Sequence, residues 1–182
     1  MTLLRFADVT LSRGGRTLFE GLDLRLMPGE GLQVTGPNGS GKSSLIRLAA
    51  GLLAPRSGHV ERAPLALADD RPALDRELPL RHALAFWAEA CDGPMRALGI
   101  DHLGGIPVRL LSSGQLKRAA LARVAASGAP LWLLDEPLNA LDADAADRLA
   151  GLVDQHRAGG GAVLAASHQP LAGEWRRVAL QP

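Results

Sequence analysis

One stretch decides how this chain folds, and it reads Gly36-Pro37-Asn38-Gly39-Ser40-Gly41-Lys42-Ser43. It fits the pattern G-x-x-x-x-G-K-[ST], which joins a strand to a helix through a glycine-rich turn. The short run Gly31–Thr35 before it and the helically spaced apolar residues of Ser44–Leu52 after it supply that strand and that helix. Backbone N–H groups in such a turn point at a polyphosphate, and the helix N-terminus adds favourable partial charge. The stretch therefore predicts a phosphate-binding loop and not an ordinary glycine-rich turn.

The side chains of this loop have separate predicted roles. Lys42 is expected to reach the β- and γ-phosphates of a nucleotide, and the Ser43 hydroxyl is expected to bind Mg²⁺. The predicted nucleotide-binding residues of the loop are Gly36, Pro37, Asn38, Gly39, Ser40, Gly41, Lys42, Ser43 and Ser44.

Composition narrows the class of protein. A length of 182 residues with 47% hydrophobic content suits one domain with a sizeable core. A net charge of +1 and 3% aromatic residues argue against nucleic acid as a partner. The single cysteine, Cys91, excludes an internal disulfide and is interpreted as a small buried side chain. The sequence has neither an apolar run long enough to span a membrane nor a secretory signal, so we expect a cytoplasmic location.

The chain begins with an antiparallel arrangement that leads into the phosphate-binding loop. Leu3–Leu11 alternates weakly and Leu22–Leu26 alternates cleanly, so both are predicted strands, joined by a turn at Ser12–Arg16. Beyond the helix of the loop, His59–Glu61 and Leu65–Ala68 are short strand candidates.

The middle of the chain predicts a smaller helical lobe, at about residues 72–125, inserted into the core. Residues 79–103 indicate helical pieces, with Pro94 and Gly99 as breaks. Phe86 and Trp87 are interpreted either as core of this lobe or as a docking surface, with the core slightly favoured for at least one of them.

Two further motifs follow the lobe. Leu110–Gln115 leads into the helix-forming run Leu116–Ala125, and Ser112 or Ser113 is a natural N-cap. A serine- and glycine-rich turn at a helix start is also a possible anion site, although many helices begin this way.

A continuous apolar run then ends in two acids, Asp135 and Glu136. Such a run suits a central parallel strand that is covered on both faces, and its carboxyl end lies where open α/β sheets bind ligands. A helix at Ala143–Arg157 and a buried strand at Ala162–Ala166 are predicted next. His168 follows that strand, and Arg176–Leu180 is the last strand candidate.

The order of these motifs resembles the ATP-binding cassette (ABC) ATPase domain over nearly the whole chain. Gly36–Ser43 matches the Walker A motif of that family, Ser112–Gln115 its signature motif and Leu131–Asp135 its Walker B motif. Asn139–Asp142 matches the D-loop, and His168 matches the switch histidine. The resemblance implies one α/β domain, a P-loop NTPase core with an antiparallel β subdomain and the small helical lobe.

The resemblance also implies an ATPase mechanism. Ser43 and Asp135 would hold Mg²⁺, Glu136 would orient or deprotonate the attacking water, and His168 would hydrogen-bond the γ-phosphate. In the family, ATP joins two protomers head to tail, and each completes the site of the other. The residues that would do so here are Ser112, Ser113, Gly114, Gln115 and Asp142.

Three positions depart from the family pattern. Ser113 replaces a usual glycine, which adds a small side chain that should be tolerated. Arg71 lies where the family has a glutamine that contacts Mg²⁺, and Asp69 or Asp70 could supply the missing oxygen. Arg13 lies where an aromatic side chain usually stacks on adenine, and its guanidinium plane can stack on the base instead.

One branch of the family is especially similar: the haem-exporter ATP-binding subunits of cytochrome c biogenesis. The short length and the segments Arg16–Phe19, Leu131–Leu138 and Ser167–Leu171 carry this resemblance. It implies a membrane permease partner, a location at the cytoplasmic face of the inner membrane, and release of a haem-loaded chaperone. The alternatives are a soluble ABC ATPase in iron–sulfur assembly, repair or translation, a transporter subunit for another substrate, and a nucleotide-gated partner that hardly hydrolyses ATP.

Overall fold

The computed structural model describes residues 1–180, which form two sheets, several short helices and two long ones. The antiparallel sheet has the order β2-β1-β4, from β1 (Leu4–Arg13), β2 (Arg16–Leu26) and β4 (Ser57–Arg62). β1 and β2 pair from Leu4 opposite Leu26 to Arg13 opposite Arg16. Gly14 and Gly15, with φ of 58° and 78°, make the tight turn between them, as the sequence predicts.

The parallel sheet has the order β5-β6-β7-β3-β8. Its strands are β5 (Leu65–Ala68), β6 (Leu131–Asp135), β7 (Ala162–Ala166), β3 (Gly31–Thr35) and β8 (Arg176–Ala179). Every residue of β6 and β7 is buried, because these central strands are covered on both faces. The predicted parallel core is therefore confirmed.

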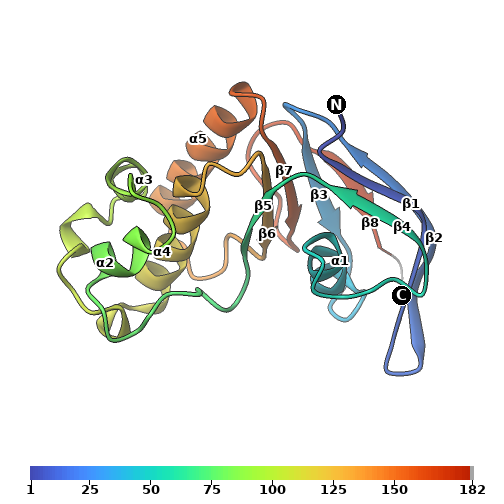
Figure 1. The fold of residues 1–182 in the computed structure, drawn as a ribbon, viewed down its shortest axis with the longest axis horizontal. Coiled ribbons are helices and arrows are strands. Elements are labelled where there is room, and N and C mark those ends of the chain that lie inside the picture. Colours follow the sequence, from blue (N-terminus) through green and yellow to red (C-terminus); the bar gives the residue numbers. More distant parts are fainter. Residues whose placement is uncertain (181–182) are drawn as a thin grey trace.

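Alternate residues of β6 face two different cores. Leu131 and Leu133 pack with α1 (Lys42–Ala49) and the antiparallel sheet. Trp132 and Leu134 pack with the helices on the other side. Figure 1 shows the resulting layers, with α1 held between the two sheets and the helical part beyond the parallel sheet. This arrangement fixes the ends of β3 and β6 beside the start of α1.

The second layer of helices holds α4 (Ser113–Ala126) and α5 (Ala143–Ala158), and the lobe adds α2 (Leu80–Ala85) and α3 (Asp92–Ala97). Two single turns of 3-10 helix, Asp101–Leu103 and Val108–Leu110, connect the lobe to α4. In the described part of the chain, no helix is both long and apolar enough to cross a membrane.

The lobe corrects two predictions. Pro94 does not break a helix, because it lies in the first turn of α3, where its missing N–H would have no acceptor within the helix. Gly99, with φ of 66°, does end that segment, as predicted. Phe86 is 81% exposed and Trp87 is 43% exposed, so the interpretation of either as lobe core is wrong. Cys91 is buried, as predicted.

Candidate functional site

The loop between β3 and α1 is shaped by glycines in conformations that other residues rarely adopt. Gly36 has φ of 143°, and a Cβ there would lie 2.5 Å from the carbonyl oxygen of Leu180. Gly41 has φ of 100° and forms the N-cap of α1. A side chain at Gly36 would clash with that carbonyl, and one at Gly41 would be strained by the positive φ, so the glycines let the loop curl over the helix N-terminus.

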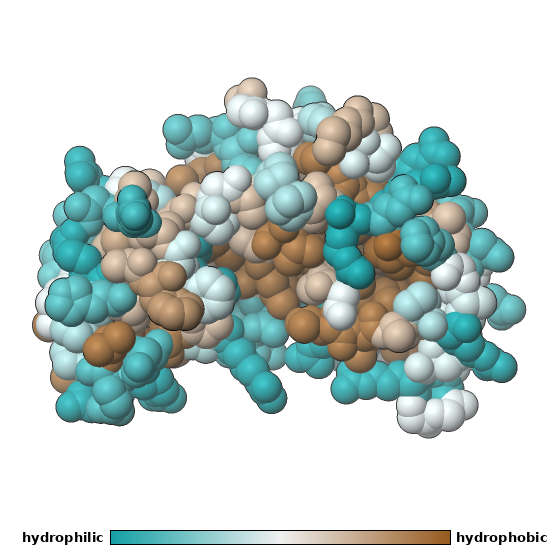
Figure 2. Space-filling model, in the orientation of Figure 1, coloured by the Kyte–Doolittle hydropathy of each residue, from teal (hydrophilic) through white to brown (hydrophobic). Residues whose placement is uncertain are grey.

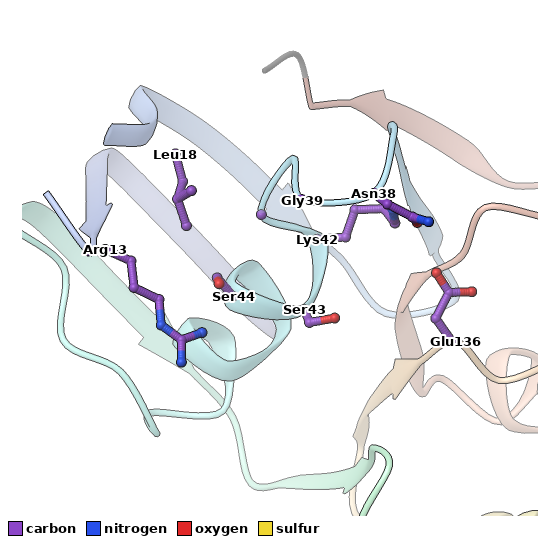
Figure 3. Close-up of a pocket in the computed structure, with 10 residues that line it drawn as sticks. Arg13, Leu18, Asn38, Gly39, Lys42, Ser43, Ser44 and Glu136 are labelled. Carbon is purple, nitrogen blue, oxygen red and sulfur yellow. The ribbon is translucent and has the colours of Figure 1, made fainter. Parts of the chain in front are cut away.

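This loop borders a cavity of about 460 Å³. Figure 3 shows Arg13 and Leu18 on one side of the loop and Glu136 on the other. The cavity is lined by Arg13, Gly14, Leu18, Asn38, Gly39, Gly41, Lys42, Ser43, Ser44 and Glu136. Strand ends and a helix N-terminus thus meet at one opening, which is the arrangement that binds a polyphosphate.

Lys42 lies at the first position of α1, and its ammonium points back along the loop. It donates hydrogen bonds to the carbonyl oxygens of Gly36 at 2.8 Å and Pro37 at 3.2 Å. The side chain is only 6% exposed, so the charge is held beside the turn rather than in solvent. An ammonium group in this position can also donate to phosphate oxygens.

Ser43 and Asp135 bring two oxygen groups together, as the sequence predicts for a metal site. The Ser43 hydroxyl donates to Asp135 Oδ1 at 3.0 Å. Asp135 is 2% exposed, and this burial raises the pKa of its carboxyl group while the hydrogen bond from Ser43 opposes the rise. A hydroxyl and a carboxylate beside a phosphate cavity are the hard oxygen donors that Mg²⁺ prefers, so the residues present fit that ion.

Glu136 and His168 form a second pair, held at the ends of β6 and β7. His168 Nδ1 lies 2.8 Å from Glu136 Oε2. Glu136 has a positive φ of 45°, which is rare for a residue with a side chain and turns its carboxylate toward the cavity. A carboxylate oriented by an imidazole beside a phosphate site can accept a proton from water.

The Ser112–Gln115 motif lies elsewhere on the surface. Ser112 and Gln115 form a capping box that starts α4, so Ser112 is the N-cap. Ser113 borders a separate hollow of about 250 Å³ together with Asn139 and Ala140. A Cβ on Gly114 would lie 2.6 Å from the carbonyl oxygen of Ala140, so this glycine lets α4 pack directly against the next loop.

The remaining predicted site residues are also placed by the structure. Asp142 caps α5 by accepting from the N–H of Ala145 at 2.8 Å, away from the cavity at the phosphate-binding loop. Arg71 borders a groove near Leu52 and Trp87 instead of that cavity, and Asp70 borders the hollow beside Ser113. Within one described chain, then, the structure brings together the loop, Asp135, Glu136, His168 and Arg13 but not the signature motif.

The family profile described as ABC transporter matches residues 19–139, which is more than half of the 182 residues. The chain belongs to the ABC transporter family. The segments that match the Walker A, signature and Walker B motifs all lie within this range. ATP binding, with hydrolysis coupled to transport, is therefore the activity of this chain.

Curated ABC transporter relatives are similar over nearly the full length. The cytochrome c biogenesis ATP-binding export protein CcmA of Sphingopyxis alaskensis is 54% identical and covers 94% of this chain and 93% of its own. The protein of the same name from Novosphingobium aromaticivorans is 55% identical and covers 91% and 88%. That of Gluconobacter oxydans is 45% identical and covers 93% and 82%.

Solved ABC transporter structures share the fold. An ATP-binding subunit of an ABC transporter superposes with a TM-score of 0.84 at 24% identity, covering 92% of this chain and 80% of that one. A nucleotide-free ATP-binding cassette superposes with a TM-score of 0.78 at 21% identity, covering 93% and 82%. The α/β class with a P-loop core and an antiparallel β subdomain is thereby confirmed.

Two side chains near the ABC transporter site were not predicted from the sequence. Leu18 lines the cavity from β2, whereas its neighbour Phe19 packs against the core. Lys117 donates to the backbone carbonyl of Asp135 at 3.0 Å. The alternation of β2 could have indicated Leu18, but the contact of Lys117 depends on how α4 packs against β6 and has no signal in the sequence.

Proposed function

We propose that this chain is the ATPase subunit of a haem-export complex in cytochrome c biogenesis, where it powers release of a haem-loaded chaperone from a membrane partner. The observation that carries the proposal is the identity of 54% over 94% of the chain with a cytochrome c biogenesis ATP-binding export protein. The proposal places the chain at the cytoplasmic face of the inner membrane, bound through integral membrane subunits.

In the proposed mechanism, the phosphate-binding loop and Lys42 hold the β- and γ-phosphates of ATP. Ser43 and Asp135 would hold Mg²⁺, which when bound supplies positive charge against the phosphate oxygens. Glu136 accepts a proton from the water that attacks the γ-phosphorus, and ADP leaves with the β-phosphate oxygen. His168 keeps the Glu136 carboxylate in place for that transfer. The guanidinium plane of Arg13 stacks on adenine.

We further propose that ATP binding joins two copies of the chain head to tail. The signature residues Ser112–Gln115 lie apart from the phosphate-binding loop of their own chain. The N-terminus of α4 is nonetheless an anion site with a capped, glycine-containing first turn. A second copy can bring this helix start, Ser113 and Asp142 to the γ-phosphate of the first. In this proposal the whole chain, 1–182, acts as a single ATPase domain.

The helical lobe offers a surface for the membrane partner. Leu78, Phe86 and Trp87 are 40%, 81% and 43% exposed and line a groove of about 330 Å³. A second groove of about 400 Å³ shares Trp87 and adds Leu52 and Arg71. Apolar side chains gather between the lobe and the antiparallel sheet in Figure 2. Exposed aromatic anchors of this kind fit a docking segment of a permease.

Charged residues also line these grooves. Asp75 lines the first, and Asp69, Arg71 and Arg123 line the second. The lobe also carries the ion pairs Glu77–Arg109, with 3.2 Å between Oε2 and Nε, and Arg81–Asp92. Leu80 and Leu84 are fully buried and form the core of the lobe. The proposed docking surface therefore centres on the exposed Phe86 and Trp87.

Replacing Leu78 and Phe86 together with serine is expected to uncouple the ATPase from cytochrome c maturation. The two side chains are exposed, so the free chain should still fold and bind ATP. Loss of one aromatic and one aliphatic anchor should weaken docking by about 2 kcal/mol, or roughly 30-fold. The measurement is covalent haem on c-type cytochromes in a deletion strain that carries the variant. Met27→Ser, at another exposed apolar residue outside the lobe, is the control and should complement fully.

The deletion strain itself tests the proposed function. It should lack covalent haem on c-type cytochromes, and the unmodified gene should restore it. Normal maturation in the deletion strain would overturn the haem-export assignment and leave an ABC transporter ATPase for another substrate. Co-purification with a membrane protein of several spans would separate that outcome from a soluble ABC ATPase.

Replacing Arg71 with glutamine is expected to leave ATP affinity and ATPase rate within about twofold of the unmodified chain, or to raise the rate. The guanidinium has no lone pair with which to bind a metal ion. Arg71 borders the groove beside Trp87 and not the cavity at the phosphate-binding loop. Steady-state phosphate release and nucleotide titration of both chains measure the effect. A tenfold loss of turnover would place Arg71 in the catalytic machinery instead.

A further inference from the structure

Lys117 connects the helix of the signature motif to the strand of the catalytic acids. It lies in the second turn of α4, which begins at Ser113. Its ammonium group donates a hydrogen bond of 3.0 Å to the backbone carbonyl oxygen of Asp135, the last residue of β6. The side chain is half-buried and borders the hollow between the signature turn and the loop that follows Glu136.

This hydrogen bond fixes one side of the peptide unit that joins Asp135 to Glu136. The other side is fixed as well, because the N–H of Glu136 donates to the carbonyl oxygen of Ala166 at 2.8 Å. The φ of Glu136 is the rotation about the bond that leaves this peptide plane, and its value is 45°. A plane held at both its carbonyl and its N–H therefore fixes the backbone frame from which the Glu136 side chain leaves toward the cavity.

The conformation of Glu136 needs such support. A positive φ costs a residue with a side chain of order 1 kcal/mol or more, and it persists only where neighbouring contacts impose it. The contact of His168 holds the carboxylate end, and Lys117 together with Ala166 holds the backbone end.

The charges around Lys117 suit this position. Burial has the largest effect and lowers the pKa of the Lys117 ammonium group, while the nearby carboxylates of Asp70, Asp135, Glu136 and Asp69 favour its charged form. Asp69 and Asp70 belong to the loop after β5 that carries Arg71, whose own side chain borders the docking groove. Lys117 therefore lies near the acids of that loop and near the two acids at the end of β6, on the helix that begins with the signature motif.

We propose that Lys117 is a positioning residue for Glu136, which acts by holding the carbonyl of Asp135 and thereby makes the placement of the catalytic carboxylate depend on the position of α4. The proposal rests on the catalytic role proposed above for Glu136. Lys117 does not line the cavity at the phosphate-binding loop, so it acts through Glu136 and not on ATP directly. When α4 shifts against β6, the ammonium group of Lys117 shifts with the helix. The Asp135–Glu136 peptide unit that this group holds then moves as well.

The test is the variant Lys117→Met, which keeps an apolar stem of similar shape out to Cε and removes the donor. We expect kcat to fall by about 10- to 100-fold, because small misplacements of a catalytic group have effects of this size. KM for ATP and the affinity for a fluorescent ATP analogue should stay within about twofold, because the phosphate-binding loop is untouched. Lys117→Arg keeps a cationic donor and should recover most of the lost kcat.

The matched control is Arg118→Met, on the next residue of α4. Arg118 also donates to a backbone carbonyl, that of Leu98 at 3.3 Å, but this carbonyl belongs to the lobe. Its kcat should remain close to that of the unmodified chain. Thermal unfolding of all variants checks that they fold, and Lys117→Leu, which also lacks a donor, replaces Lys117→Met if that variant does not.

A second measurement separates positioning from a purely structural role. In single-turnover hydrolysis with Glu136→Gln as the background, adding Lys117→Met should change the residual rate by less than about twofold, since a residue that acts through Glu136 has nothing left to position. An equal loss in both backgrounds, a loss confined to ATP affinity, or a failure of Lys117→Arg to rescue would overturn the proposal. If Glu136→Gln alone hydrolyses ATP normally, the proposed catalytic role of Glu136 fails first.

Discussion

Replacing Glu136 with glutamine is expected to lower ATP turnover by about 10²- to 10⁴-fold, the range that a general base contributes. ATP should still bind with nearly unchanged affinity, because Lys42 and the Ser43–Asp135 pair remain in place. With binding intact and hydrolysis slow, the proposed two-chain complex should persist. Size-exclusion chromatography with and without Mg-ATP should therefore show a dimer that the unmodified chain forms only transiently.

The matched control for this substitution is Glu174→Gln, which makes the same chemical change at an exposed carboxylate. That variant should hydrolyse ATP at the rate of the unmodified chain. A Glu136→Gln variant that also kept the normal rate would show that another group accepts the proton of the attacking water. A variant that lost ATP binding instead would mean that Glu136 shapes the phosphate cavity.

The sequence predicted the parts of the fold that depend on local pattern. The run Leu131–Asp135 is apolar and ends in an acid, so its central position in a parallel sheet followed from composition alone. The loop Gly36–Ser43 needs glycine at positions that the backbone forces to unusual angles, and this leaves a clear signature. The N-cap of α4 also depends on local sequence, because Ser112 forms its capping box with Gln115, three residues further along the chain.

The misjudged features depend on contacts between distant segments. Whether Phe86 is buried depends on what the rest of the lobe leaves uncovered, and Leu80 and Leu84 already fill that core. Pro94 is compatible with the first turn of α3, and the sequence pattern does not show where that helix begins. The contact between Lys117 and Asp135 joins a helix to a strand that is distant in the sequence. Helix α4 has several basic residues, and nothing in the sequence distinguishes Lys117 from the others.

Replacing Lys42 with alanine should have the opposite pattern to Glu136→Gln, with loss of nucleotide binding itself. The ammonium group is buried beside the loop, and hydrogen bonds to charged groups contribute about 1.5–3 kcal/mol each. Loss of one such contact to phosphate corresponds to an affinity about 10- to 150-fold lower. Titration with a fluorescent ATP analogue measures this directly, without any need for hydrolysis.

The same substitution also removes the donor that the carbonyl oxygens of Gly36 and Pro37 share. Both carbonyls lie in a loop beside an open cavity, so water can replace the ammonium group and the nucleotide-free chain should keep its melting temperature within a few degrees. Lys42→Arg is the informative companion, because it keeps the charge but spreads it over a planar group that does not fit the point contact of Lys42. An intermediate affinity for Lys42→Arg would show that charge and shape both contribute. Unchanged affinity in Lys42→Ala would mean that the backbone N–H groups and the helix N-terminus bind the phosphates without the side chain.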